Sequence, residues 1–331
     1  DADGTIRIDG RIAGTLSQPE IRADIVLDRL GMDLPGLEQR LREVTGRITV
    51  SPGTLVLEGI DGRIDDGRFT LDGRVGLDGF RPDQMALEFT ARQLPIEVPD
   101  TLSLLADSRL RLNGTAAAST LNGEITLLEG LYYRDVALNL LQGVTTKTRE
   151  VAPQAPAGPP DFLDRMALNI VIRHREPFLV ENNLAEMSLS PDLRILGTAA
   201  RPVVSGRAAV DEGEITYQKR VFEIQKGVVD FLNPYRTEPT IDIKGEATVR
   251  DWIISLQVSG TPDNLDFKLT STPAEEHADI LSLLVFGKTL KEMRQDDGGS
   301  GLSARQLLGS ILADSVASGV KGATGLDIVE M

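Results

Sequence analysis

The 331-residue chain contains no cysteine, one tryptophan and two histidines, and aromatic residues make up only 4% of it. The lack of cysteine excludes a disulfide framework, cysteine-ligated zinc and thiol chemistry. No run approaches about 18 consecutive apolar residues, so we expect no membrane-spanning helix. Basic residues are outnumbered by acidic ones: the chain has 35 Lys and Arg and 50 Asp and Glu, which gives a formal net charge of −15. A duplex nucleic-acid binder needs a basic face, so that class is excluded too.

The chain begins at Asp1 without a secretory signal sequence, so we interpret it as a piece of a longer protein. Any export signal or membrane anchor is then expected outside it. Aromatics are scarce but glycine is common, at 32 residues. A chain of many strands with frequent turns accounts for this composition better than an aromatic-rich compact core does.

Apolar and polar residues alternate along most of the chain. In residues 240–249, for example, Ile241 and Ile243 alternate with Asp242 and Lys244. This period of two predicts strands with one face withdrawn from water. After Arg250-Asp251 the pattern resumes at Trp252, so these two segments are expected to form a hairpin.

The same alternation supplies 23 candidate residues for one continuous apolar sheet face. They are Leu55, Leu57, Phe69, Leu71, Leu87, Phe89, Leu110, Leu112, Ile125, Leu127, Ile170, Ile172, Leu193, Ile195, Phe222, Ile224, Ile241, Ile243, Ile254, Leu256, Val258, Phe267 and Leu269. Two interpretations fit them equally well. Either two sheet faces seal each other in an ordinary core, or the sheet curls into an open trough that takes an apolar ligand.

Turn chemistry is abundant between these runs. Asp-Gly and Asn-Gly pairs supply the positive φ angles of tight turns, and we expect hairpin turns at each of them. They occur at residues 3–4, 9–10, 61–62, 66–67, 72–73, 78–79, 113–114 and 122–123. The ligand spacing of a calcium-binding EF-hand loop is absent. Four Gly-Thr pairs, at 14–15, 114–115, 197–198 and 260–261, are each expected to end a strand.

Two regions depart from the strand pattern. Residues 142–160 contain four prolines and no periodicity, which predicts a mobile loop within a continuous β meander over residues 1–272. Residues 273–331 are expected to hold two amphipathic helices, one ending at Gly287 and one from Leu302 to about Val316, followed by the start of a strand. Capping of the sheet end is the preferred role for these helices, and docking to a partner or membrane is the alternative.

No catalytic or metal-binding constellation is found. His174 and His277 lack partners with ligand spacing; we expect His174 at a solvated strand edge and His277 on an exposed helix side. Serine-nucleophile and phosphate-loop motifs are missing. The acidic group Asp211, Glu212 and Glu214 is interpreted as a turn around Gly213. We therefore expect a non-enzymatic protein without a cofactor.

The second half of the chain resembles the C-terminal domain of the TamB family, within the AsmA-like, bridge-like lipid-transfer group. An ordered set of pieces over about 90 residues carries the resemblance, whereas residues 1–196 match only in style. The pieces are Gly213-Glu214-Ile215, residues 227–231, Asn233-Pro234, Glu238-Pro239, residues 241–243, residues 251–254, Gly260-Thr261-Pro262, residues 269–273 and residues 280–288.

This resemblance implies a β-taco, meaning an elongated U-shaped antiparallel sheet with an apolar groove lined by the 23 residues. It implies a periplasmic location in a Gram-negative bacterium, with an inner-membrane anchor outside this chain. Its implied partners are phospholipids and TamA, an outer-membrane barrel with POTRA domains. Chains of this family are expected to run on into further amphipathic strands, and this sequence stops at residues 325–331, so we expect it to be truncated at the start of such a strand.

Two functions follow from the resemblance. The first is transfer of phospholipid acyl chains along the groove between the inner and outer membranes. The alternative is a folding platform for outer-membrane β-barrel proteins, acting with TamA by β-strand augmentation. A secreted adhesin or β-solenoid is a third class, against which the ordered C-terminal pieces argue.

Overall fold

The computed structural model describes residues 2–15, 18–33, 40–79, 81–136, 161–234 and 237–296. Within them the chain forms one sheet of 16 strands, a short 3₁₀ turn and two short helices. The strands are β1 Ala2–Thr15, β2 Gln18–Asp33, β3 Arg40–Ser51, β4 Thr54–Ile64, β5 Gly67–Asp78, β6 Arg81–Val98, β7 Leu102–Thr115, β8 Ser119–Tyr132, β9 Met166–His174, β10 Phe178–Glu181, β11 Ala185–Thr198, β12 Arg201–Tyr217, β13 Arg220–Phe231, β14 Thr240–Val249, β15 Trp252–Thr261 and β16 Asn264–Thr272. The helical elements are η1 Leu163–Arg165, α1 His277–Phe286 and α2 Leu290–Asp296.

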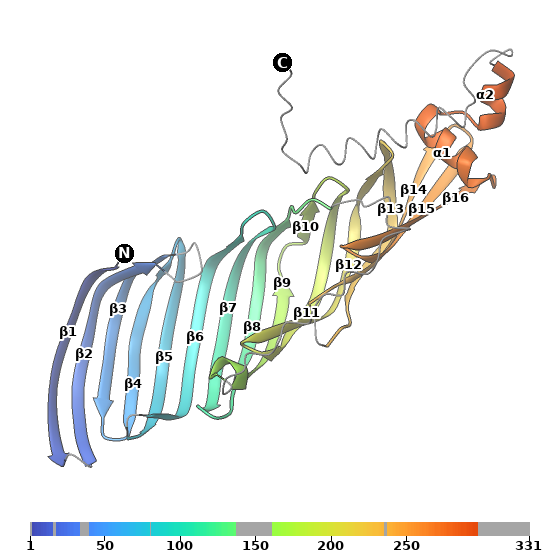
Figure 1. Cartoon of the computed structure of the whole chain (residues 1–331). Helices are drawn as coiled ribbons and strands as arrows, with labels where there is room; N and C mark the ends of the chain where they lie inside the picture. Colours follow the sequence, from blue (N-terminus) through green and yellow to red (C-terminus); the bar gives the residue numbers. More distant parts are fainter. Residues whose placement is uncertain are drawn as a thin grey trace, which may run out of the picture.

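Neighbouring strands in the sequence are neighbours in the sheet, and they pair antiparallel, with one exception. The exception is that β9 and β10 both run parallel to β8, and both pair with β11. Figure 1 shows β1 to β8 side by side as a long bowed wall, which the later strands continue towards α1. The predicted class, mainly β with a long antiparallel sheet, is confirmed.

The strand ends follow the Gly-Thr signal. β1, β7, β11 and β15 end at Thr15, Thr115, Thr198 and Thr261, each directly after a glycine. The hairpin of β14 and β15 around Arg250-Asp251 is also confirmed.

Most Asp-Gly and Asn-Gly pairs do not reverse the chain, so that prediction was wrong. Residues 3–4, 9–10, 61–62, 72–73, 113–114 and 122–123 all lie inside strands, and only 66–67 and 78–79 coincide with reversals. The acidic group around Gly213 likewise lies within β12, beside a register shift between β11 and β12. A glycine with positive φ can bend or bulge a strand as readily as it can end one.

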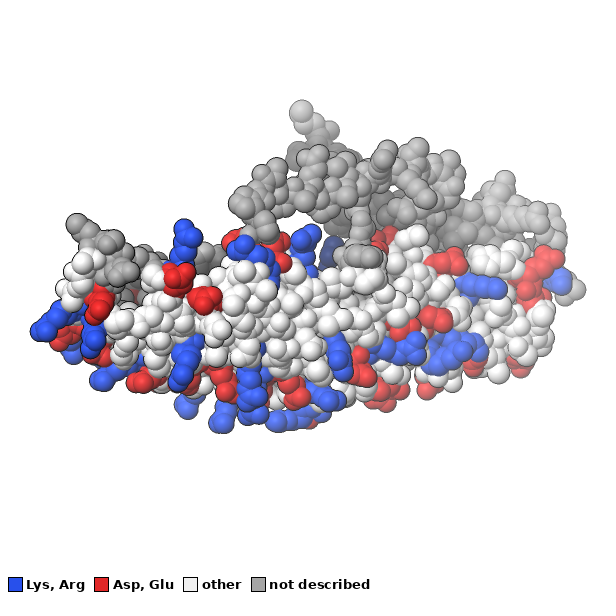
Figure 2. Space-filling view, turned by 90° about the horizontal axis from the view of Figure 1, so that it is seen from below, with Lys and Arg blue, Asp and Glu red and all other residues white. Residues whose placement is uncertain are grey.

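Two faces of the sheet can be assigned from the register, because directly paired residues point to the same side. We call the side that carries Leu71, Phe89 and Leu110 the apolar face, and the opposite side the polar face. On the polar face charges pair across strands, as in the 3.2 Å contact between Arg111 Nη2 and Glu88 Oε1. Figure 2 shows charged residues gathered along one side of the molecule and a band of uncharged residues along its length.

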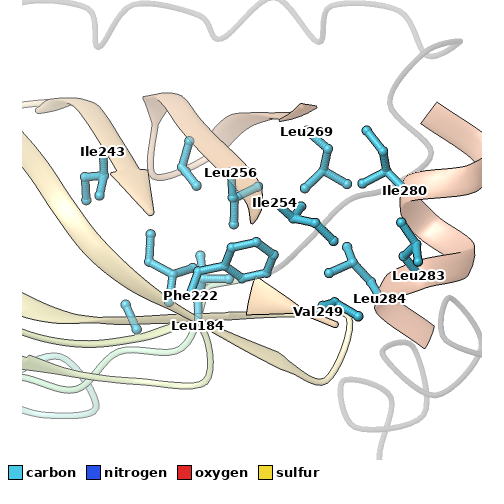
Figure 3. Close-up of a cluster of buried hydrophobic side chains, with 13 residues drawn as sticks. Leu184, Phe222, Ile243, Val249, Ile254, Leu256, Leu269, Ile280, Leu283 and Leu284 are labelled. Atoms are coloured by element: carbon cyan, nitrogen blue, oxygen red, sulfur yellow. The ribbon is translucent and has the colours of Figure 1, made fainter. Parts of the chain in front are cut away.

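Helix α1 packs on the apolar face at the C-terminal end of the sheet, where it completes what we call the terminal core (Figure 3). Arg220 Nε donates to the carbonyl oxygen of Leu284 at 2.7 Å, and Arg250 Nη1 to that of Gly287 at 3.2 Å. These two contacts satisfy carbonyls that a helix end leaves without intrahelical partners. The terminal core consists of Leu184, Ala185, Ile215, Phe222, Ile243, Val249, Ile254, Leu256, Val258, Leu269, Ile280, Leu283 and Leu284.

The first C-terminal helix was therefore predicted in the right place, with Gly287 (φ 71°) as its C-cap. Glu276 is the N-cap of this helix. Helix α2 was missed, because its polar sequence, LKEMRQD, lacks an apolar period. The second predicted helix, the terminal strand and the proline-rich loop lie outside the described residues.

Truncation of the helix side chain at the centre of the terminal core should be costly. Leu283 is 0% exposed, so Leu283→Ala should lower the free energy of unfolding by about 2–5 kcal/mol, as for other buried leucines. Urea titration would measure it. Val221→Ala is the control, because Val221 is 51% exposed and its loss should cost under about 0.5 kcal/mol. Equal losses in both variants would contradict this role of α1.

Gly73, inside β5, tests whether the mid-strand glycines are structurally required. Its φ is +142°, and an added Cβ would lie 2.8 Å from Leu87 Cα and even closer to the carbonyl oxygen of Ala86. Gly73→Ala should therefore cost about 1–3 kcal/mol of unfolding free energy. Gly76→Ala in the same strand meets only ordinary contacts and should be neutral or slightly stabilising. A neutral Gly73→Ala would show that the backbone bend is not needed.

Candidate ligand-binding face

A continuous apolar row crosses seven strands from β5 to β12. Leu71 pairs with Phe89, and Phe89 with Leu110. The row continues through Gly123 and Ile170 to Ile195 and Val204. At about 4.8 Å per strand it is roughly 29 Å long. Only glycine and aliphatic or aromatic side chains occur in it.

All 23 sequence-predicted residues lie on this same face. The register connects them strand by strand: Leu57 is in line with Gly73 and Leu87, and at the other end Ile243 pairs with Val258, which pairs with Phe267. Each of the 23 is buried or half-buried, and none is exposed. Their common face follows from the structure, whereas their role in a lipid groove stays a prediction.

The cover over this face changes along the sheet. Phe222, Ile254 and Leu256 are 0% exposed because they lie in the terminal core with α1. Leu87 and Leu112, near the middle of the sheet, are half-buried. At the N-terminal end the face is open, since Ile6, Ile8 and Ile12 of β1 are 55%, 66% and 74% exposed.

The sequence prediction began the face too late. Ile8, Ile25 and Ile48 of β1 to β3 pair with one another and with Leu57, so they belong to the same face. Their signal is the same alternation, visible in Ile6-Arg7-Ile8-Asp9, which the candidate set did not include.

Two aromatic pairs fill parts of the apolar face. Phe69 and Phe89 stack with ring centroids 6.0 Å apart, and Tyr217 and Phe267 stack at 5.2 Å. Burial raises the pKa of the Tyr217 phenol, so this ring stays neutral near pH 7. Four of the few aromatic side chains thus stack in pairs on the apolar face.

Three polar atoms interrupt this face. Ser108 pairs with Ile125, Ser119 with Met166 and His174 with Leu127, which places all three side chains on the apolar side. Their Oγ or Nδ1 atoms are buried without a hydrogen-bond partner among the described residues. His174 is the last residue of β9, so it does lie at the end of its strand, but it is half-buried and not solvated as predicted. His277 is exposed at the start of α1, as expected.

Two open hollows on the described part of the sheet are mainly polar. One, of about 530 Å³, is lined by residues such as Asp3, Arg29 and Arg40, and the other, of about 490 Å³, by residues such as Arg109 and Glu124. Neither is lined by any of the 23 apolar candidates. These hollows do not belong to the apolar face, and the closure of that face into a groove remains a prediction.

Three carboxylates, Asp230 and Glu246 on the polar face and Glu292 in α2, have their pKa lowered by specific hydrogen-bond donors. Arg207 donates to Asp230 at 2.6 and 2.9 Å and lowers its pKa. The pKa of Glu246 is lowered mainly by the hydrogen bond from the Lys244 ammonium group, 2.7 Å away, and further by the hydrogen bond from Ser255. The pKa of Glu292 is lowered mainly by the hydrogen bond from the backbone N–H of Thr289 and further by the charge of Arg250. All three arrangements link neighbouring elements of the fold.

Within the described ranges, no group of three or more His, Asp or Glu residues could hold a metal ion. Likewise, none of the helices described here combines the length and apolarity needed to cross a bilayer.

The Asp230 carboxylate predicts a pH dependence. Because its folded-state pKa is lowered, its contribution is present above the unfolded value and lost as pH falls below about 4. Arg207→Ala should therefore reduce stability at about pH 7 but change it less in strong acid. Urea midpoints of both proteins across this range would measure it, and a pH-independent difference would assign the effect to packing.

A family model, the TamB C-terminal domain, matches residues 58–331, which is most of the chain. The match includes 21 of the 23 apolar candidates and the whole terminal core, and it leaves out Leu55 and Leu57 together with β1 to β3. The family is associated with the translocation and assembly module of the cell envelope and with its component TamA. The earlier resemblance is thereby confirmed: the chain belongs to the TamB C-terminal domain family.

Proposed function

We propose that the apolar face carries phospholipid acyl chains between the inner and outer membranes in the periplasm. The observation that carries this proposal is the unbroken apolar row from Leu71 to Val204, which lies outside the terminal core and whose side chains, apart from the buried Ile170, are only partly covered. In this proposal the sheet forms a U-shaped groove, with acyl chains on the apolar face and headgroups at its solvated mouth.

The energetics suit passive, non-enzymatic transfer. Each buried methylene contributes about 0.8 kcal/mol, so an acyl chain is held firmly by a row of aliphatic side chains. Neighbouring positions along the row are chemically alike, so movement from one to the next changes the binding energy little. The terminal core already buries its part of the face beneath α1, so we place the acyl chains on the strands before it.

The boundary between the terminal core and the rest of the apolar face determines which substitutions can test the groove. Ile243 and Leu256 are 3% and 0% exposed and belong to the terminal core, so a charge there would damage folding. Leu87 and Leu112 are a half-buried cross-strand pair outside it. Beside them, Ala86 and Asn113 form the adjacent exposed pair on the polar face.

The test compares Leu87→Asp/Leu112→Asp with Ala86→Asp/Asn113→Asp. Both variants add carboxylates to the same two strands, on opposite faces. After detergent-free purification, native mass spectrometry and lipid extraction should find phospholipid in the wild type and the polar-face variant, and a loss of at least about ten-fold in the apolar-face variant. Circular dichroism checks that each protein is folded. Retention of lipid by the folded apolar-face variant would refute the groove.

The second candidate function is a platform that pairs with a client β-strand in barrel assembly with TamA. A wild-type protein that is monodisperse and free of lipid would favour this platform over lipid transfer.

A further inference from the structure

Four arginines lie next to one another on the polar face, one on each of four neighbouring strands. Arg42 of β3 pairs directly with Arg63 of β4. Arg63 pairs in turn with Arg68 of β5, and Arg68 with Arg92 of β6. We call these four residues the arginine row. At about 4.8 Å between strands the row is roughly 14 Å long. Described strands flank it on both sides, β2 next to β3 and β7 next to β6, so it lies within the sheet and not at an edge.

The arginine row is unfavourable for the sheet on its own. Its direct pairs set like charges opposite each other, and such cross-strand pairs are destabilising. Arg63 has one ion pair, in which its Nη2 lies 3.7 Å from Oδ1 of Asp66, a side chain that is 100% exposed. Arg42, Arg68 and Arg92 have no ion-pair partner among the described residues. Three guanidinium groups are thus left without a counter-charge in this part of the chain.

Carboxylates beside the row serve the sheet's own hydrogen bonds. Asp61 accepts a hydrogen bond from the hydroxyl group of Thr45 at 3.3 Å. Asp107 accepts one, at 2.8 Å, from the backbone N–H of Gln93, at the register shift between β6 and β7. These acids stabilise a neighbouring side chain and an irregular backbone position, and the charge of the row stays available to a ligand.

One end of the row continues into an open hollow. Arg92 lines the hollow of about 490 Å³ together with Arg109 and Arg111 of β7. Arg111 contacts Glu88 at 3.2 Å, whereas Arg109 has no ion-pair partner among the described residues. Guanidinium donors therefore extend one strand beyond the row.

The row is only one residue wide. Asp61 lies beside it on the same face, two residues before Arg63, and Asp66 lies two residues before Arg68 on the other side. A broad anionic surface such as a bilayer would bring these carboxylates against its own negative charges. A narrow anion that follows the row can contact the arginines and leave the carboxylates in water.

We propose that the arginine row binds an acidic segment of a partner polypeptide, extended across β3 to β6. An extended chain advances about 3.3 Å per residue, so about four or five residues span the row. Alternate side chains point to the same side, so Asp or Glu at alternate positions would all face the arginines. Arginine holds carboxylates through paired N–H donors, and the bound carboxylates would separate the like charges of the row.

This proposal does not depend on what the apolar face binds, because it uses side chains of the opposite face. It can fail while lipid transfer stands, and the reverse.

The test is fluorescence anisotropy of the full 331-residue chain with a labelled peptide of about ten residues in which Glu alternates with Ser. Saturable binding is expected, and it should weaken as salt is added, because salt screens exposed charges. Arg68→Glu should weaken binding by at least about ten-fold, since it reverses a central charge of the row. The variant should stay folded, with an unchanged or raised thermal midpoint, because Glu at this position faces Arg63 and Arg92.

Arg74→Glu is the matched control. Arg74 is an exposed arginine on the same strand and the same face, it pairs with Val56 and Ala86, and its substitution changes the net charge equally. It lies six residues from Arg68, about 20 Å and more than the screening length of about 8 Å at physiological salt, so binding should stay within about three-fold.

Three outcomes would overturn the proposal. One is a wild type that does not bind the acidic peptide. Another is an equal loss of binding in Arg68→Glu and Arg74→Glu, which would show attraction by net charge alone. The third is a wild type that binds vesicles containing phosphatidylglycerol more firmly than the peptide and loses them in Arg68→Glu, which would assign the row to a membrane surface.

Discussion

The structure depends on one constraint, the two-residue side-chain period maintained through a continuous hydrogen-bonded ladder. A slip of one residue would move every side chain of a strand to the opposite face. The register shifts of this sheet preserve the assignment: Ile224 pairs with Gly245 and Gly227 with Ile243, although the intervening spacing on β13 is odd. The extra residue is absorbed locally, and the apolar face continues on both sides of it.

A consequence is that one surface is built from many separate strands without a compact centre. Most of its members are half-buried, and complete burial is concentrated in the terminal core. There α1 supplies Ile280, Leu283 and Leu284, and Arg220 and Arg250 satisfy the carbonyl groups at its end. The helix is therefore part of the sheet's packing, and its role as a cap over the backbone groups at the sheet's edge stays a prediction.

On the polar face the same register places charged side chains directly opposite one another on neighbouring strands. Cross-strand pairs such as Arg207 and Asp230 are complementary, whereas Asp9 with Asp24 and Arg11 with Arg22 are not. Unfavourable pairs also occur further along the sheet, in the arginine row of β3 to β6.

The sequence by itself determined the strand class, the shared face of the candidate residues, the Gly-Thr strand ends and the place of α1. These features depend on local period and on the residue at a strand or helix end. The sequence did not determine whether Asp72-Gly73 forms a hairpin turn or a bend within a strand, because a glycine with positive φ occurs in both. It missed α2, whose polar sequence has no apolar period. Only the tertiary structure decided that Leu256 is sealed while Leu112 is half-covered, since both lie in identical alternating patterns. That difference comes from α1, which the chain brings back onto one end of the face from a different part of the sequence.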